Sequence, residues 1–136
     1  MYNRLLLPHG IRVLLAPEHE SLTTTVLVLV AAGSKYEIKE HNGISHFLEH
    51  LCFKGTKQRP TALAITSELD SMGAEYNAFT GEEFTGYHAK AEHRHAIKLI
   101  DLITDMYANP VFDAAEIEKE KGVIIEEINM YQDDPM

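Results

Sequence analysis

The sequence predicts an α+β fold in which helices pack on one face of an antiparallel sheet. Three observations support this class. The first third of the 136-residue chain carries β-branched and apolar runs, two later segments alternate around a polar turn, and four segments repeat apolar residues at helical spacing. The strands therefore fall into hairpins, and the order of elements is three strands, two helices, two strands and two helices.

The composition is that of an ordinary globular protein, with 45% hydrophobic and 24% charged residues. The chain is long enough for one core, so we expect a single domain over residues 1–136. The longest apolar run covers residues 26–32, far short of the roughly 20 residues that cross a bilayer. The leucines after Arg4 are broken by Pro8, too early for a signal peptide. We expect neither a membrane span nor a signal peptide.

The charge balance is acidic, with 12 Lys and Arg against 21 Asp and Glu and a formal net charge of -9. Such a chain repels phosphate backbones and anionic lipids, so we expect no binding to nucleic acid or to a membrane. Cys52 is the single cysteine, which excludes an intramolecular disulfide and a cysteine-rich metal cluster. A reducing compartment is compatible with this, and we expect a cytoplasmic protein in which Cys52 packs as a small hydrophobe.

The first expected element is a hairpin, formed by residues 5–7 and 11–16 around a turn that Pro8 and Gly10 favour. A long strand follows over residues 23–31, where β-branched and apolar residues run without helical periodicity. We expect this strand to be covered on both faces.

Residues 32–41 lack a period and are expected to form a loop that ends at Asn42, a good N-cap. The helix that follows reaches about Phe53, where Gly55 helps to stop it. Its apolar residues recur at helical spacing: Ile44, Phe47, Leu48 and Leu51.

Thr61 is the expected N-cap of a second helix, which Gly73 ends as the residue after its last turn. Residues 74–79 and 84–91 alternate in strand fashion around a turn at residues 80–83. This spacing predicts a second hairpin. We expect its first strand to lie at the edge of the sheet, open to pairing with a peptide.

Two helices close the chain. The first covers about residues 93–108 and is stopped by Asn109 and Pro110. The second begins near Asp113, whose side chain can cap it, with Glu116 completing a capping box, and it continues to about Tyr131.

The most informative motif is the pentad His46-Phe47-Leu48-Glu49-His50 in the first helix. Residues four apart on a helix lie about 40° apart around its axis and one turn along it, so both imidazoles can reach one metal ion. Glu49 lies beside the second histidine, where its carboxylate can hydrogen-bond a metal-bound water and accept its proton. The order His-x-x-Glu-His is the inverse of the commoner zinc-protease pentad.

Two histidines near a helix end are more often surface or capping residues, but apolar side chains flank this pair and place it at a boundary of the core. A third ligand is available on the last helix, where Glu120 and Glu127 lie seven residues apart and so share a face. Either could complete a His-His-Glu site with water in the fourth position, the open arrangement of a catalytic zinc.

The pentad and its surroundings are similar to the zinc-binding signature of the family that contains pitrilysin, insulin-degrading enzyme and mitochondrial processing peptidase. The resemblance extends over nearly the whole chain, since the family's opening hairpin, substrate-binding edge strand and distal-glutamate helix each have a counterpart. The matching segments are residues 7–13 (LPHGIRV), 42–51 (NGISHFLEHL), 53–56 (FKGT), 73–80 (GAEYNAFT) and 118–128 (EKEKGVIIEEI). At His9 the family more often has Asn.

The resemblance implies a set of site residues. The zinc ligands that it implies are His46, His50 and Glu127, and the catalytic general base that it implies is Glu49. Glu120 would be a second catalytic carboxylate that orients a ligand histidine. Glu126 is the alternative third ligand. We choose Glu127 because its place after Val-Ile-Ile matches the family's register and it shares a face with Glu120, whereas Glu126 is turned about 100° away.

By the same resemblance, Asn77 and Ala78 bind an extended peptide, Ala78 through its backbone, so that the substrate adds a strand to the sheet edge. Considered without the family, Asn77 would be an ordinary strand residue.

The function that the resemblance implies is that of a zinc-dependent endopeptidase acting on peptides or unfolded polypeptide segments. Water held by Zn²⁺ and activated by Glu49 would attack the scissile carbonyl. The alternative is a non-catalytic structural or substrate-recognition subunit of the same family, but such subunits typically lack part of the pentad, which is whole here. The related thioether lyases need a cysteine after the pentad as third ligand, and the sequence has none after Cys52.

Members of this family resemble a clamshell of two or more homologous halves, each longer than this chain. We therefore interpret residues 1–136 as an incomplete N-terminal zinc-binding peptidase domain, the front of a first half. A second half or subunit is then a missing partner. We expect the isolated chain to be a poor peptidase and to self-associate.

Overall fold

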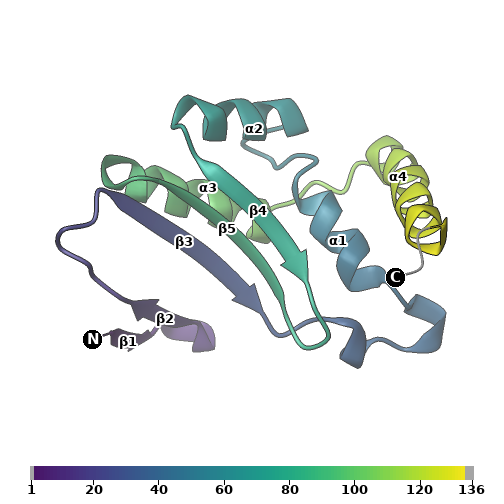
Figure 1. The fold of residues 1–136 in the computed structure, drawn as a ribbon, viewed down its shortest axis with the longest axis horizontal. Coiled ribbons are helices and arrows are strands. Elements are labelled where there is room, and N and C mark those ends of the chain that lie inside the picture. The colour runs from purple at the N-terminus through teal and green to yellow at the C-terminus, as the bar shows by residue number, and fades with distance from the viewer. Residues whose placement is uncertain (1, 134–136) are drawn as a thin grey trace.

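The computed structural model describes residues 2–133, which form two antiparallel sheets and four α-helices (Figure 1). The α+β fold predicted from the sequence is confirmed. The strands are β1 (Asn3–Leu6), β2 (Arg12–Leu15), β3 (Thr23–Val30), β4 (Glu75–Thr80) and β5 (Thr85–Glu92). The helices are α1 (Ile44–Cys52), α2 (Ala62–Ser71), α3 (Ala96–Ala108) and α4 (Ala114–Asp133). In this described part of the chain, every helix is too short or too polar to cross a bilayer.

The larger sheet has the strand order β3-β5-β4, and both pairs are antiparallel. β4 and β5 form the predicted hairpin, and β3 pairs with the other side of β5. β4 is thus an edge strand, as expected. α1 lies beside β4, and α4 packs on the far side of α1 (Figure 1). This arrangement brings the edge strand, the pentad helix and the last helix together.

The N-terminal hairpin forms as predicted, with β1 and β2 paired along their whole length. Its turn is a 3-10 turn over Pro8–Gly10, in which His9 and Gly10 have positive φ angles of 69° and 85°. The two strands remain a separate sheet. Large apolar side chains on this hairpin therefore stay exposed, among them Leu6 and Leu14.

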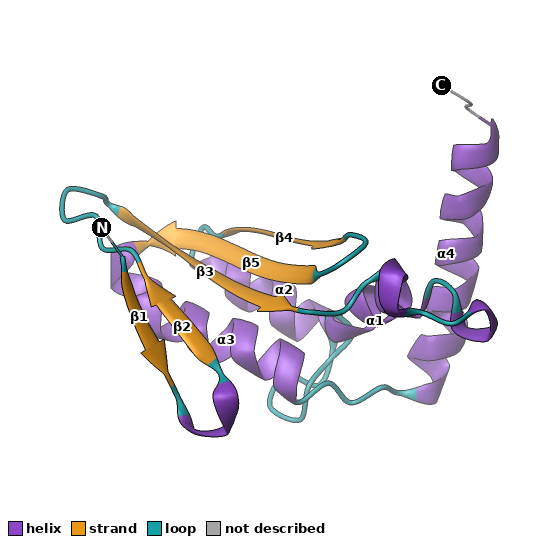
Figure 2. Cartoon of the chain, turned by 90° about the horizontal axis from the view of Figure 1, so that it is seen from below, coloured by secondary structure: helices purple, strands orange, loops and turns teal. Residues whose placement is uncertain are grey.

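β3 is covered on one face only, so the expectation that both faces are covered is wrong. Val26 and Val28 pack against the core, whereas Leu27 and Leu29 are 51% and 55% exposed. The reason is the placement of the helices. α2 and α3 lie on the side of the sheet that carries the valines (Figure 2), and the described residues place no helix on the other side.

The core lies between the sheet and the two helices beneath it. Apolar residues at helical spacing put one stripe of α2 and one of α3 against β5. The fully buried apolar side chains of these helices are Ile65, Leu69, Leu99, Leu102, Ile103 and Met106. Each such burial contributes roughly 1.5–3 kcal/mol, so this interface holds the sheet against α2 and α3.

A buried ion-pair cluster, not expected from the sequence, joins the segment after α1 to α2 and α3. Arg59 is 8% exposed. Its guanidinium donates to Glu68 on α2 at 2.6 Å and to Asp101 and Asp105 on α3 at 2.7 and 2.8 Å. Thr56 Oγ1 also donates to Asp105, at 2.6 Å. The segment that leaves α1 is therefore anchored to both core helices.

α1 begins differently from expectation. Asn42 is not its N-cap: Gly43 takes that position with a φ of 89°, a left-handed conformation that glycine adopts without strain. The carboxylate of Glu37 replaces the side-chain cap by accepting hydrogen bonds from the backbone N–H groups of Ser45 and Gly43, at 2.8 and 2.6 Å. These bonds hold the pKa of Glu37 below its ordinary value.

The other predicted caps are confirmed. Thr61 Oγ1 accepts a backbone N–H of the first turn of α2 at 3.1 Å. Gly73 follows α2 with a φ of 61°. Asp113 Oδ1 accepts two backbone N–H groups of the first turn of α4, at 2.9 and 3.2 Å. Local sequence signals therefore place these three ends correctly.

Two helix starts differ in detail. The Glu116 carboxylate pairs with Lys119 Nζ at 2.5 Å instead of reaching back to the backbone at Asp113, so the expected capping box is only half formed. α3 begins at Ala96 rather than near His93, because residues His93–His95 form a 3-10 turn before it.

Candidate metal centre

α1 carries the pentad and presents two neighbouring stripes of side chains. Leu51 and Cys52 are buried, whereas His46, Glu49 and His50 are only partly buried. α1 lies between β4 and α4 and contacts both (Figure 1). The stripe with the two histidines and the glutamate therefore meets elements that are distant in the sequence.

The three predicted metal ligands lie together. The Nε2 atoms of His46 and His50 are 3.0 Å apart, and Glu127 Oε2 lies 3.8 Å from each of them. All three side chains are partly exposed, and their ligand atoms lie within 4.8 Å of one another. Glu126 is exposed and stands outside this group. α4 therefore turns Glu127, and not its neighbour, toward the histidines.

These side chains fit a zinc ion. Zinc binds imidazole nitrogen and carboxylate oxygen at about 2.0–2.2 Å in a tetrahedron, which places ligand atoms about 3.3 Å apart. The observed separations of 3.0 and 3.8 Å lie on either side of this value. Three protein ligands leave a fourth position for water or substrate, as in catalytic zinc sites.

Glu120 holds His50 in one orientation. It is 3% exposed, and its Oε1 accepts a hydrogen bond from His50 Nδ1 at 2.8 Å. With the proton on Nδ1, the lone pair of a neutral His50 is on Nε2, the atom nearest to His46 and Glu127. The other oxygen of Glu120 pairs with Lys54 Nζ at 2.5 Å. Burial alone raises the pKa of Glu120, but the bonds from Lys54 and His50 outweigh it and hold the pKa below its ordinary value.

Glu49 is held by the edge strand. Thr80, the last residue of β4, donates a hydrogen bond from Oγ1 to Glu49 Oε2. The hydroxyl of Thr85 lies 3.4 Å from that of Thr80 and donates to the carbonyl of Ala32 at 3.0 Å. Glu49 therefore has a defined partner, although its carboxylate stands outside the group of three ligand atoms.

Lys54 and Thr80 are contacts of the site that were not predicted. Lys54 comes four residues after His50 and lies just beyond the end of α1 at Cys52, so its side chain leaves the helix end near that of His50. Thr80 comes two residues after Ala78, so strand alternation puts both on the same face of β4. These spacings were the signals available in the sequence.

A cavity of about 290 Å³ joins the site to the edge strand. Its walls include Glu49, His50 and Glu120 on one side and Asn77 and Ala78 on the other. Asn77 Oδ1 accepts a hydrogen bond from the backbone N–H of Ala78 at 2.9 Å. That N–H is bonded within its own strand rather than to β5, so it belongs to the open edge. The predicted substrate-binding residues thus lie beside the pentad.

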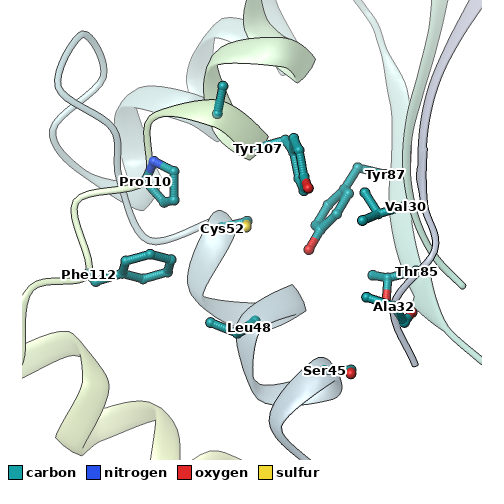
Figure 3. Close-up of a pocket in the computed structure, with 11 residues that line it drawn as sticks. Val30, Ala32, Ser45, Leu48, Cys52, Thr85, Tyr87, Tyr107, Pro110 and Phe112 are labelled. Carbon is teal, nitrogen blue, oxygen red and sulfur yellow. Dashed lines mark hydrogen bonds between the residues drawn. The ribbon is translucent and has the colours of Figure 1, made fainter. Parts of the chain in front are cut away.

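A second cavity, of about 510 Å³, lies against the other stripe of α1 (Figure 3). Leu48 and Cys52 line it from α1, opposite Tyr87 of β5 and beside Tyr107 and Phe112. Cys52 is buried, as expected, and burial raises the pKa of its thiol. A neutral buried thiol is a poor metal ligand, so the chemistry is concentrated on the β4 side of α1.

The sequence of the chain matches the model of a known protein family. The model of the family described as insulinase, peptidase family M16, matches residues 12–136. The matched span covers most of the chain and includes every predicted site residue.

Two relatives and one solved structure are similar over almost the whole chain. The uncharacterized zinc protease YmxG of Bacillus subtilis (strain 168) is 41% identical over 135 residues, which cover 99% of this chain and 33% of that protein. The beta subunit of the mitochondrial-processing peptidase of Mus musculus is 44% identical over 123 residues, 90% of this chain and 24% of that protein. The crystal structure of a protease from Helicobacter pylori matches with a TM-score of 0.90 at 26% identity, over 98% of this chain and 32% of that one. The chain thus spans a quarter to a third of their length.

Proposed function

Because the chain belongs to the insulinase family of peptidases, family M16, we propose that it carries the metal centre of a zinc-dependent endopeptidase. The observation that carries the proposal is the convergence of His46, His50 and Glu127 beside Glu49. Two relatives support the reaction class, since one is called a zinc protease and the other a processing peptidase.

His46 and His50 are proposed to hold the zinc ion through Nε2, and Glu127 through a carboxylate oxygen. When bound, zinc supplies a Lewis acid that polarises the scissile carbonyl and lowers the pKa of water. Glu120 keeps the proton of His50 on Nδ1, which leaves Nε2 free for the metal. The donor set suits this ion because imidazole nitrogen and carboxylate oxygen are ordinary zinc ligands.

Glu49 is the proposed general base. Its carboxylate accepts a proton from the attacking water and returns it to the nitrogen of the leaving amine. The Thr80 hydroxyl binds Oε2 of Glu49, which leaves Oε1 for the proton. A positioned base of this kind contributes on the order of 10²–10⁴-fold to the rate.

β4 is the proposed substrate strand. It lies at the sheet edge and borders the cavity that also contains Glu49 and His50. An extended peptide can add to this edge by backbone hydrogen bonds, including one from the Ala78 N–H that Asn77 now occupies. Only a chain segment free to become extended can bind in this way, so the proposed substrates are peptides and unfolded polypeptide segments.

The complete activity needs more than this chain. Efficient hydrolysis requires donors for the developing oxyanion and a wall that excludes water and fixes the peptide. Because the relatives are about three to four times as long, we assign these parts to a second homologous half or subunit. One of these relatives is itself named as a subunit, which is in line with such an assembly.

Metal removal tests the proposal. In a longer protein that carries this chain and the second half, hydrolysis of a quenched, unstructured peptide should stop after dialysis against a chelator. One equivalent of zinc should restore it, whereas magnesium should not, because Mg²⁺ prefers octahedral oxygen sites. Peptide hydrolysis that persists after the zinc has been removed would overturn the assignment.

A further inference from the structure

We propose that Lys54 is a positioning residue of the metal centre, which acts through Glu120 on His50. The proposal rests on the proposed function, because it takes His46, His50 and Glu127 as the zinc ligands. Lys54 does not touch the metal ligands' donor atoms. Its contribution is to fix the group that fixes His50.

The Glu120 carboxylate has one partner on each oxygen. Oε1 accepts from His50 Nδ1 at 2.8 Å, and Oε2 pairs with Lys54 Nζ at 2.5 Å. The Glu120 side chain is 4% exposed and that of Lys54 is 28% exposed. A buried carboxylate of α4 is therefore clamped between two side chains that are four residues apart in the chain.

The two contacts are needed together. The terminal bond of a glutamate side chain is broad in its torsion, so a single hydrogen bond leaves the plane of the carboxylate loosely set. The Lys54 ammonium fixes the second oxygen and pairs a charge that burial would otherwise make costly. His50 then has a fixed acceptor at Nδ1, which directs Nε2 toward the other two ligands.

The backbone of Lys54 and of the residues after it is fixed by hydrogen bonds and close packing. Its backbone N–H donates to the Leu51 carbonyl at 3.1 Å. Gly55, the next residue, has a φ of 145°, and a Cβ there would lie 2.7 Å from the carbonyl oxygen of Pro60. Thr56 then bonds to the buried Arg59 cluster. The backbone after Lys54 is therefore tightly packed, which fixes the point from which its side chain extends toward Glu120.

A purely structural role makes different predictions. If the ion pair only docked α4 on α1, loss of Lys54 would loosen the helix and weaken zinc binding through Glu127. The proton of His50 would then stay on Nδ1 in every molecule in which Glu120 still accepts the hydrogen bond from His50. The position of this proton separates the two roles.

The first measurement is the zinc affinity of the 136-residue chain, by competition with a chelating dye. Lys54→Met should weaken zinc binding about tenfold, the low end for loss of an outer partner of a metal ligand. Lys54→Arg keeps a cationic donor and should restore most of the affinity. Lys57→Met removes the same charge from an exposed position three residues away and should leave the affinity unchanged.

The second measurement is the tautomer of His50 in the zinc-free chain, from imidazole ¹⁵N shifts at about pH 8, where an ordinary imidazole is neutral. The parent and Lys54→Arg should show the Nδ1–H form, and Lys54→Met a mixture of both tautomers. Far-UV circular dichroism reports whether each variant keeps its helices. If Lys54→Met does not fold, a Lys54→Gln variant takes its place in both measurements.

Unchanged zinc affinity in the folded Lys54 variant overturns the proposal. A weaker affinity with His50 still in the Nδ1–H form also overturns it, because helix docking alone predicts that result. If the parent chain binds no zinc, the proposed function fails instead, while the tautomer of His50 still decides whether Lys54 acts through Glu120.

Discussion

Thr80 and Glu49 are joined by a hydrogen bond from the threonine hydroxyl to the carboxylate Oε2. The bond links the last residue of β4 to the proposed general base. A peptide that pairs with β4 is therefore aligned by the same strand that holds the base. This link reduces the freedom of base and substrate relative to each other, which is a requirement for efficient proton transfer.

Glu49→Gln should keep zinc and lose peptide hydrolysis. The glutamine oxygen can still accept from Thr80, so the local geometry is retained, but the amide cannot take up a proton at neutral pH. In the longer protein we expect kcat to fall by about 100-fold or more at unchanged zinc content. Peptide turnover and atomic absorption check the two halves of this prediction. A variant as active as the parent would remove Glu49 from the role of base.

His50→Ala should abolish stoichiometric zinc binding, because it removes one of the three proposed ligands and the hydrogen-bond partner of Glu120. Atomic absorption after dialysis measures the zinc that remains. His93→Ala is the matched control, since His93 is exposed in the turn before α3 and should not affect the metal. One zinc per chain retained by the His50 variant would show that the metal binds elsewhere.

Ala78→Pro should weaken substrate binding at the edge of β4. Proline removes the N–H that belongs to the open edge and leaves the ladder with β5 intact. The peptide carbonyl that would have met this N–H is then left unpaired, which should raise KM by roughly tenfold, with a smaller effect on kcat. Ala78→Ser keeps the N–H and serves as control in the same steady-state assay. An unchanged KM in the proline variant would contradict strand addition at this position.

Asp105 should make stability depend on pH. Burial raises the pKa of this carboxyl, but hydrogen bonds from Thr56, Asn109 and Arg59 together lower the pKa by more than burial raises it. The pKa of Asp105 in the folded protein therefore lies below the ordinary value. The stabilisation is therefore present above about pH 4 and is lost as the pH falls through the folded pKa. Asp105→Asn should lower the free energy of unfolding by about 3 kcal/mol at neutral pH, and by less in acid.

Urea denaturation at neutral and at acid pH measures this difference. Asp101→Asn is the control, because Asp101 pairs with the same arginine but its side chain is 56% exposed. An exposed pair contributes about 1 kcal/mol or less. A destabilisation by Asp105→Asn that does not shrink on acidification would show that the charge of Asp105 is not its source.

The chain should self-associate through the uncovered face of the larger sheet. Leu27 and Leu29 are more than half exposed there, and the large apolar side chains of the N-terminal hairpin are exposed as well. Light scattering should give a mass above the 15.3 kDa of one chain, rising with concentration. Replacing both leucines by glutamate should shift the mass toward the monomer. A parent chain that is monomeric at high concentration would contradict the prediction.

Short-range patterns explain what could be predicted from the sequence. The four-residue spacing of His46 and His50 and the seven-residue spacing of Glu120 and Glu127 each follow from the geometry of one helix. The caps at Thr61 and Asp113 are also local, because the side chain and the backbone groups it bonds lie within one turn. Such features depend on neighbours in the chain and not on the packing of distant elements.

Contacts between distant segments explain the rest. Glu37 caps α1 from six residues before Gly43, whereas a capping side chain normally belongs to the N-cap residue itself. Glu120 lies 70 positions from His50, so neither its contact with Lys54 nor its depth of burial could be inferred locally. The open face of β3 depends on which side α2 and α3 take, and the apolar run of the strand itself is compatible with either arrangement.

At rest, β4 does not offer its edge freely, because the Asn77 side chain already occupies the Ala78 N–H. A stray strand that makes only this contact exchanges one hydrogen bond for another and gains little. An extended peptide that continues along Glu75–Thr80 gains several backbone bonds at once. The edge therefore discriminates by length: a contact confined to this position is disfavoured, whereas a segment long enough to follow the strand can bind.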